Sequence, residues 1–105
     1  MPLELSERLS EVALSYAYEM YQEGFWCHKN PINGELVGDR LSKKGFPFID
    51  IGENLALSSS VRSGHNSLMN SESHKSTILD NEFKRVGIGI VSGPVGLIIV
   101  QIFSS

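Results

Sequence analysis

The chain lacks several features that would mark it as a member of particular protein classes. Cys27 is its one cysteine among 105 residues, so no disulfide can form within the chain. This fits a reducing compartment, and it also fits an exported bacterial protein that folds without disulfides. The longest apolar run covers residues 97–100, far short of the roughly 20 residues of a membrane-spanning helix. We therefore expect no transmembrane segment.

An excess of basic charge is also absent. Lys and Arg total 9 against 12 Asp and Glu, which gives a net charge of −3 with His neutral. Nucleic-acid-binding domains present a basic face, so we expect no nucleic-acid partner. The N-terminus leads directly into a helix-like pattern without a signal peptide. The sequence leaves open whether an export segment or a lipid anchor lies upstream of this chain.

The composition is that of an ordinary soluble globular protein. Hydrophobic residues make up 41% and charged residues 20% of the chain. A chain of this length predicts one domain over residues 1–105, with a core that needs neither disulfides nor a metal.

The first half of the chain predicts two helices. The first carries an apolar stripe at helical spacing and ends near Gly24. The stripe consists of Leu5, Leu9, Val12, Ala13, Tyr16, Ala17 and Met20. A loop over 27–35, with His28 at its entrance, is indicated by the turn pairs of Asn30 with Pro31 and Asn33 with Gly34. A short helix over 35–44 follows, with Gly45 as its left-handed cap.

The second half predicts short helices and then strands. Residues 46–51 are expected to be extended, a third helix to cover 61–70, and a helical turn to cover 74–79. Over residues 86–91, Val86, Ile88 and Ile90 alternate with Gly87, Gly89 and Val91, which predicts a strand. A turn is expected at 92–96, and a second strand, apolar on both faces, over 97–103. This order predicts an α+β fold with helices packed on the faces of a small antiparallel sheet.

The stretch "FIDIGENLAL", residues 48–57, places Glu53 inside an apolar run. Gly52, Glu53 and Asn54 could form a plain turn, or Glu53 could be held at a site. His28, His65 and His74 are the histidines to weigh with it, and none has local metal-ligand spacing. A single histidine is more often a surface or structural residue. This applies most to His65, which lies on the apolar stripe of its helix.

Nucleophilic catalysis has little support in the sequence. Serines are plentiful, but no Gly-x-Ser-x-Gly elbow is present. Cys27 is adjacent to His28, and adjacent side chains on an extended chain point to opposite faces. We therefore lean away from an enzyme and leave that question open.

Six blocks together resemble the CAP superfamily, which includes cysteine-rich secretory, antigen 5 and pathogenesis-related proteins, and in particular its bacterial SCP-like branch. They are "FWCHKNPINGE", "DRLSKKGF", "GENLA", "LMNSESHKSTILD", "FKRVGIGIV" and "VQIF", and they run in the family's order over residues 3–103. The resemblance implies a three-layer α-β-α sandwich. The helix that the family usually has before Pro2 has no counterpart in this sequence.

The resemblance also implies a cleft lined by two histidines and two acids. The first histidine carries over to His28, the acid to Glu53 and the second histidine to His74, with Asn54 holding Glu53. In some members the histidine pair binds a divalent metal such as Zn²⁺, which here would be His28 and His74. The second acid has no match. Its position falls near Ser71, and Glu72 and Asp39 are only nearby.

The resemblance and the residues leave three hypotheses, two functional and one purely structural. The first is a non-enzymatic, exported or surface-attached domain that binds a small apolar ligand, such as a sterol or fatty acid, or a host or partner protein. The second is a zinc-binding cleft of His28 and His74 with Glu53, with weak hydrolytic activity through bound water. In the third, Glu53 and the histidines only join the sheet to the helices by hydrogen bonds.

Overall fold

The fold is a mixed sheet covered by helices. The computed structural model describes residues 3–59, 78, 83–93 and 96–105. Its elements are β1 (Glu4–Leu5), α1 (Glu7–Glu23), α2 (Val37–Lys43), β2 (Ile51–Ser58), β3 (Arg85–Gly93) and β4 (Gly96–Ser104). The strand order is β1-β3-β4-β2. The predicted α+β class is confirmed, but the sheet is not purely antiparallel, because the two-residue β1 pairs parallel to β3.

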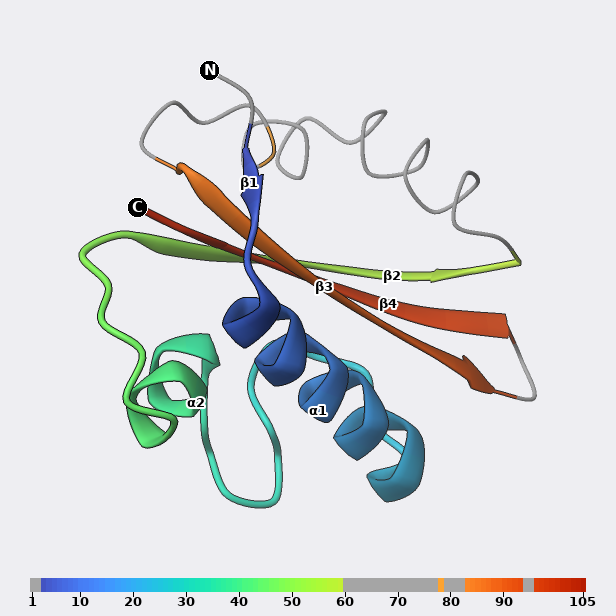
Figure 1. Cartoon of the computed structure of the whole chain (residues 1–105). Helices are drawn as coiled ribbons and strands as arrows, with labels where there is room; N and C mark the ends of the chain where they lie inside the picture. Colours follow the sequence, from blue (N-terminus) through green and yellow to red (C-terminus); the bar gives the residue numbers. More distant parts are fainter. Residues whose placement is uncertain (1–2, 60–77, 79–82, 94–95) are drawn as a thin grey trace.

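Both described helices lie on the same face of the sheet, as Figure 1 shows. They enclose the main core with the inward residues of β2 and β4, such as Leu55, Val100 and Ile102. The opposite face carries a smaller cluster, in which Ile78 packs against Ala56 and Ile99. The predicted helix over 61–70 lies outside the described residues, as does most of the predicted turn over 74–79. The second helical layer of the sandwich therefore stays a prediction.

Helix α1 follows the predicted apolar stripe with one correction at its start. Ser6 caps the helix, and its hydroxyl accepts a hydrogen bond from the Leu9 N–H at 3.2 Å. Leu5 therefore lies in β1, where it is 70% exposed, and does not belong to the helix stripe. The other six predicted stripe residues are buried. Gly24 ends the helix with φ of 74°, as its position predicted.

Two glycines of β3 allow α1 to lie directly on the strand. A Cβ on Gly87 would lie 2.2 Å from the backbone carbon of Leu9, and one on Gly89 would lie 2.1 Å from the backbone nitrogen of Leu14. Real Cβ atoms do not approach backbone so closely, so any side chain here would push the helix away. The alternation of glycine with Ile88 and Ile90 is therefore explained by helix packing.

Helix α2 is shorter than the predicted 35–44, since it begins two residues later and ends one residue earlier. The Asp39 carboxylate accepts the Leu36 N–H at 3.0 Å, so the helix begins at Val37 rather than at residue 35. After Lys43, Gly45 adopts φ of 68°, and the Phe46 N–H bonds the Leu41 carbonyl at 3.0 Å. This is the Schellman arrangement, which the glycine predicted.

The Gly52–Asn54 segment is a strand, so its interpretation as a turn is wrong. It lies inside β2, where Glu53 is opposite Ile102 and Asn54 is opposite Gln101 of β4. Pairing with a buried, apolar strand decides the conformation here, against the local preference of a glycine-acid-amide sequence. The extended segment predicted over 46–51 reaches the sheet only at Ile51.

Candidate functional site

Glu53 is the centre of a buried polar cluster beneath the β2 side of the sheet. Its side chain is 2% exposed. One carboxylate oxygen, Oε2, accepts a hydrogen bond from Arg40 Nη2 at 2.5 Å, and the other, Oε1, lies 2.9 Å from His28 Nδ1. A buried carboxylate is costly unless it is paired and hydrogen-bonded. Here both oxygens have a partner, and one partner carries a positive charge.

Arg40 joins α2 to the loop that carries His28. It is 7% exposed, and Nη1 donates to the carbonyl oxygen of His28 at 3.2 Å and more weakly to that of Glu35 at 3.4 Å. Its guanidinium carbon lies 3.3 Å from the centre of the Tyr16 ring, a cation–π contact. Arg40 thus holds the Glu53 carboxylate and the His28 backbone at once.

Tyr16 supports the same loop from α1. Its hydroxyl donates to the carbonyl oxygen of His28 at 3.0 Å and also contacts that of Cys27. The ring is fully buried, and burial raises the pKa of the hydroxyl to about 12. Tyr16 therefore remains a neutral phenol near pH 7 and acts here as a hydrogen-bond donor.

Asn30 fixes the loop beyond His28. It is 2% exposed, its Nδ2 donates to Glu19 Oε1 at 3.0 Å, and its Oδ1 accepts the Ile32 N–H at 2.8 Å. The second bond closes the turn that the Asn-Pro pair predicted. The loop is therefore tied to α1 on both sides of His28.

The His28 ring is the part of the cluster that meets solvent. Its side chain is 52% exposed, in contrast to Glu53 behind it. Because a carboxylate only accepts hydrogen bonds, the 2.9 Å contact assigns the proton to Nδ1. The other ring nitrogen, Nε2, is then left with its lone pair for a ligand, a metal or water.

The structure separates Asn54 from the cluster. Neighbouring side chains of a strand point to opposite faces, so Asn54 lies on the far side of the sheet from Glu53. It is 1% exposed, and its Nδ2 donates to Gln101 Oε1 at 3.2 Å. The prediction that Asn54 holds Glu53 is therefore wrong.

Two other predicted cleft residues have different outcomes. His74 lies outside the described residues, as do Ser71, Glu72 and His65. Asp39, one of the two nearby acids, caps the start of α2 and is exposed. Within the described ranges, no group of three or more His, Cys, Asp or Glu side chains is placed to hold a metal ion.

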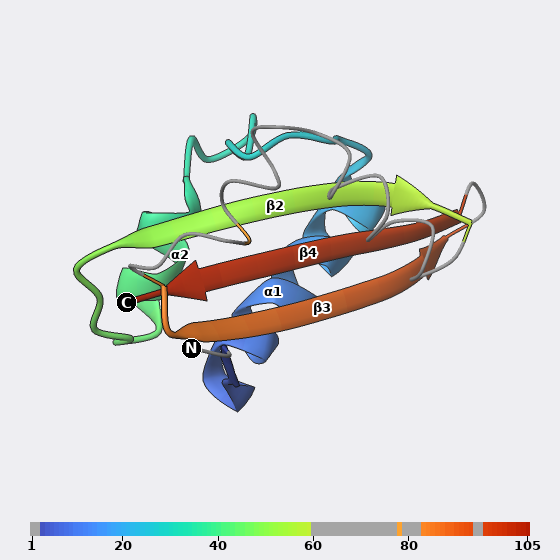
Figure 2. The same cartoon turned by 90° about the horizontal axis from the view of Figure 1, so that it is seen from above.

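Arg40 is the site residue that the sequence did not reveal. The position of Glu53 in an apolar run implies a cationic partner, because a buried carboxylate needs one. That partner must be one of the 9 Lys and Arg residues of the chain. Choosing among them requires the tertiary fold, which brings α2 against β2. Figure 2 shows this helix beneath the start of that strand.

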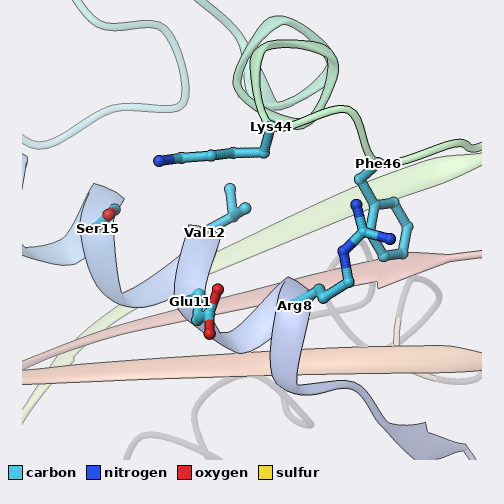
Figure 3. A pocket seen from close by; sticks show the side chains of 6 residues that line it. All are labelled: Arg8, Glu11, Val12, Ser15, Lys44 and Phe46. Atoms are coloured by element: carbon cyan, nitrogen blue, oxygen red, sulfur yellow. The ribbon is translucent and has the colours of Figure 1, made fainter.

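A small surface pocket lies apart from this cluster, at the junction of α1 with the end of α2. Its volume is about 120 Å³, and Figure 3 shows its six lining residues. Arg8 spans it: one guanidinium nitrogen donates to the Gly45 carbonyl at 3.3 Å, and the group lies 5.1 Å from the centre of the Phe46 ring. None of the predicted site residues lines it. The pocket therefore belongs to the packing of the two helices.

Neither described helix combines the length and the apolar character that crossing a bilayer would require. This finding applies only to the part of the chain that the structure describes.

Comparison with known proteins finds one family over nearly the whole chain. The cysteine-rich secretory protein family, CAP, matches residues 1–103. The chain is 30% identical over 91 residues to the uncharacterized protein YkwD of Bacillus subtilis, which covers 86% of this chain and 35% of that protein. It therefore spans about a third of the length of this curated relative.

Solved structures show the same fold. An extracellular protein containing an SCP domain from Bacillus anthracis superposes with a TM-score of 0.90 at 26% identity, covering 99% of this chain and 34% of that chain. An outer surface protein from Borrelia burgdorferi superposes with a TM-score of 0.89 at 24% identity, covering 100% of this chain and 78% of that chain. The second likeness concerns the fold alone.

Proposed function

This chain belongs to the cysteine-rich secretory protein (CAP) family, and from that premise we propose that it is a non-enzymatic binding domain acting outside the cell or at its surface. Its ligand is a small apolar molecule, such as a sterol or fatty acid, or a partner protein. The location is supported by the similar protein from Bacillus anthracis, which is described as extracellular.

The state of Glu53 carries this proposal. A catalytic carboxylate must be able to reach a substrate or a water molecule. Both oxygens of Glu53 are instead bonded to protein groups, and the side chain is 2% exposed. The Tyr16 hydroxyl in this cluster belongs to a buried phenol, whose pKa is raised to about 12 by burial. This hydroxyl donates hydrogen bonds to the loop and does not act as a nucleophile. The cluster therefore favours binding over hydrolysis.

Ligand titration tests this proposal. Trp26 is 44% exposed and lies two residues before His28, so its fluorescence can report a ligand at this loop. We expect a saturable change with a sterol or a long-chain fatty acid, or with an isolated bacterial or host surface protein. We expect no hydrolysis of ester or peptide substrates. Hydrolysis that disappears in His28→Ala would contradict the proposal.

Zinc binding at His28 is a second candidate, favoured by the pairing of its ring with Glu53. Metal-binding histidines commonly donate their other ring N–H to a carboxylate, which orients the ring and strengthens the ligand. His28 fits that role through Nε2, with Glu53 behind it. Glu53 itself does not fit as a direct ligand, because Arg40 and His28 occupy its oxygens. The second ligand in this proposal is His74, as the family resemblance implies.

Calorimetry with zinc tests the metal candidate. The double variant His28→Ala/His74→Ala should lose binding. Glu53→Gln should weaken zinc binding by about 10- to 100-fold, because the ring loses its orienting carboxylate. An unchanged affinity in the double variant would place any zinc site elsewhere, and an unchanged affinity in Glu53→Gln would remove Glu53 from the proposal.

A further inference from the structure

The His28 ring is the point at which a ligand can reach the buried polar cluster. Its side chain is 52% exposed, whereas that of Glu53 is 2% exposed and that of Arg40 is 7% exposed. The Tyr16 ring in the same cluster is fully buried. A ligand that approaches this cluster therefore meets the imidazole first, and the free nitrogen Nε2 decides which polar group can bind there.

Glu53 fixes the hydrogen-bonding role of that nitrogen. Its Oε1 lies 2.9 Å from His28 Nδ1, and its Oε2 accepts a hydrogen bond from Arg40 Nη2. Because the guanidinium group of Arg40 has only donors, Glu53 acts as an acceptor on both sides. The neutral His28 ring must then carry its proton on Nδ1, and Nε2 presents a lone pair to solvent. The exposed nitrogen is therefore an acceptor, which needs a donor from its ligand.

The segment that carries this nitrogen, residues 26–36, exposes apolar side chains to solvent. Its large exposed apolar residues are Trp26, Ile32 and Leu36, which are 44%, 67% and 48% exposed. The segment folds back on itself, because Arg40 Nη1 donates to the carbonyl oxygens of both His28 and Glu35. The start of α2 therefore lies close to the His28 end of the segment. A ligand bound at the imidazole has apolar surface available for the rest of its molecule.

A carboxylate does not match this acceptor. Carboxylate oxygens and Nε2 both present lone pairs, so the two groups repel each other unless a further proton is bound. The positive charge of Arg40 is already paired with Glu53. Lys29 follows His28 in the chain, but its Cε lies against the turn of the loop, 3.9 Å from the position that a Cβ on Gly34 would take. A hydroxyl group, in contrast, can donate its proton to Nε2.

We infer that His28 Nε2 accepts a hydrogen bond from the hydroxyl group of an apolar alcohol, and that Glu53 determines this preference by fixing the ring proton on Nδ1. The inference rests on the proposed binding function and narrows its two classes of small ligand. A sterol carries the hydroxyl that this site needs, whereas an ionised fatty acid does not. Glu53 determines specificity through His28, without touching the ligand itself.

Three ligands with the same decyl chain test it: decanol, decyl methyl ether and decanoate. The alcohol both donates and accepts, the ether only accepts, and the acid is ionised at about pH 8, where an ordinary imidazole is neutral. The titration follows the fluorescence of the exposed Trp26 in the presence of EDTA, so that no metal ion occupies Nε2. We expect decanol to bind several-fold more tightly than the ether and about tenfold or more tightly than decanoate.

Two variants should remove this preference in different ways. His28→Ala should weaken decanol several-fold, to the affinity of the ether, and Lys29→Ala, at the next exposed position, should keep the wild-type order. In Glu53→Gln, Arg40 takes the amide oxygen and the amide NH₂ faces Nδ1, which places the ring proton on Nε2. The exposed nitrogen then donates, so the ether and decanoate should gain affinity relative to decanol. Asn54→Ala, on the other face of β2, should keep the wild-type order.

Several results would overturn the inference. Equal binding of decanol and its ether by the wild type, or a preference that persists in His28→Ala, would show that Nε2 does not select the ligand. Tight binding of decanoate that Lys29→Ala abolishes would assign the site to a carboxylate. Each of these refutes the inference alone and leaves the proposed binding function standing. The absence of saturable binding by any of the three ligands and by cholesterol would contradict the small-ligand form of the proposed function as well. If Glu53→Gln does not fold, the wild type and His28→Ala decide the question, because His28 lies at the surface.

Discussion

The β3 side and the β2 side of the sheet meet the helical layer in opposite ways. Gly87, Ile102 and Glu53 lie in one row across β3, β4 and β2, and they face the helices. At Gly87 the strand presents no side chain, and the α1 backbone rests on it. At Glu53 the strand presents a carboxylate, which Arg40 and His28 reach from α2 and its preceding loop.

The difference teaches where a site can be built in this fold. Close contact between helix and strand leaves no room for functional side chains, and glycine makes that contact possible. On the β2 side, long polar side chains occupy the interface, and their charges must be matched there. One exposed ring, His28, connects this buried cluster to solvent.

Removing the charge partner on the β2 side should have the largest effect. Arg40→Ala should lower the free energy of unfolding by about 3–5 kcal/mol, because Glu53 is left buried without its cation. Chemical denaturation measures this. The double variant Arg40→Met/Glu53→Leu should recover much of the loss.

Lys43→Ala is the matched control, because Lys43 lies on the same helix but pairs with Glu35 at the surface. It should show no measurable change. If Arg40→Ala were as mild as this control, the account of a buried ion pair would be wrong.

Filling the glycine contact on the β3 side should have the next largest effect. Gly89→Ala should cost about 3 kcal/mol, because its Cβ would lie 2.1 Å from the backbone of α1. Gly45→Ala, measured by the same thermal denaturation, should cost about 1 kcal/mol, because it has open space and only the strain of a positive φ. If both variants lost the same unfolding free energy, close packing against α1 would not be the reason for glycine in β3.

Tyr16→Phe should cost about 1–3 kcal/mol, because the loop carbonyls lose their buried donor. The variant should also change the response to alkali. The pKa of Tyr16 is raised to about 12 in the folded chain, so the unfolded chain releases this proton first, from about pH 10 upward. The wild type should therefore lose stability between about pH 10 and 12 more steeply than Tyr16→Phe. If the unfolding free energies of the wild type and Tyr16→Phe fell equally with pH in this range, the burial of the hydroxyl would be contradicted.

The smallest effect on the site is expected from Asn54→Ala. It should cost about 1–2 kcal/mol through the loss of the bond to Gln101. Because Asn54 faces away from α1 and α2, the NMR signals of the His28 ring should not move. Glu53→Gln should shift those signals strongly. A similar shift in both variants would contradict the division of Glu53 and Asn54 between the two faces.

Patterns with strong local causes could be predicted from the sequence. The spacing of apolar residues predicted α1, and the glycine after Lys44 predicted the end of α2. The alternation over 86–91 and the apolar run after it predicted the hairpin of β3 and β4. The apolar run around Glu53 marked that residue as unusual, and the resemblance to a family placed it in a cleft with His28.

The remaining features depend on contacts between distant segments. Gly52–Asn54 has the composition of a turn, and only pairing with β4 makes it a strand. Arg40 is the one arginine of a short helix, and its burial follows from a carboxylate thirteen residues later in the chain. Neither contact leaves a periodic signal in the sequence.

The hydrogen bond between His28 and Glu53 is the centre of this account, and the protonation of the His28 ring tests it most directly. Nitrogen-15 NMR of the imidazole, recorded at a pH where the ring is neutral, distinguishes the two tautomers. The account predicts a proton on Nδ1, donated to Glu53, with Nε2 unprotonated and open to ligands. A neutral ring with its proton on Nε2 would contradict it.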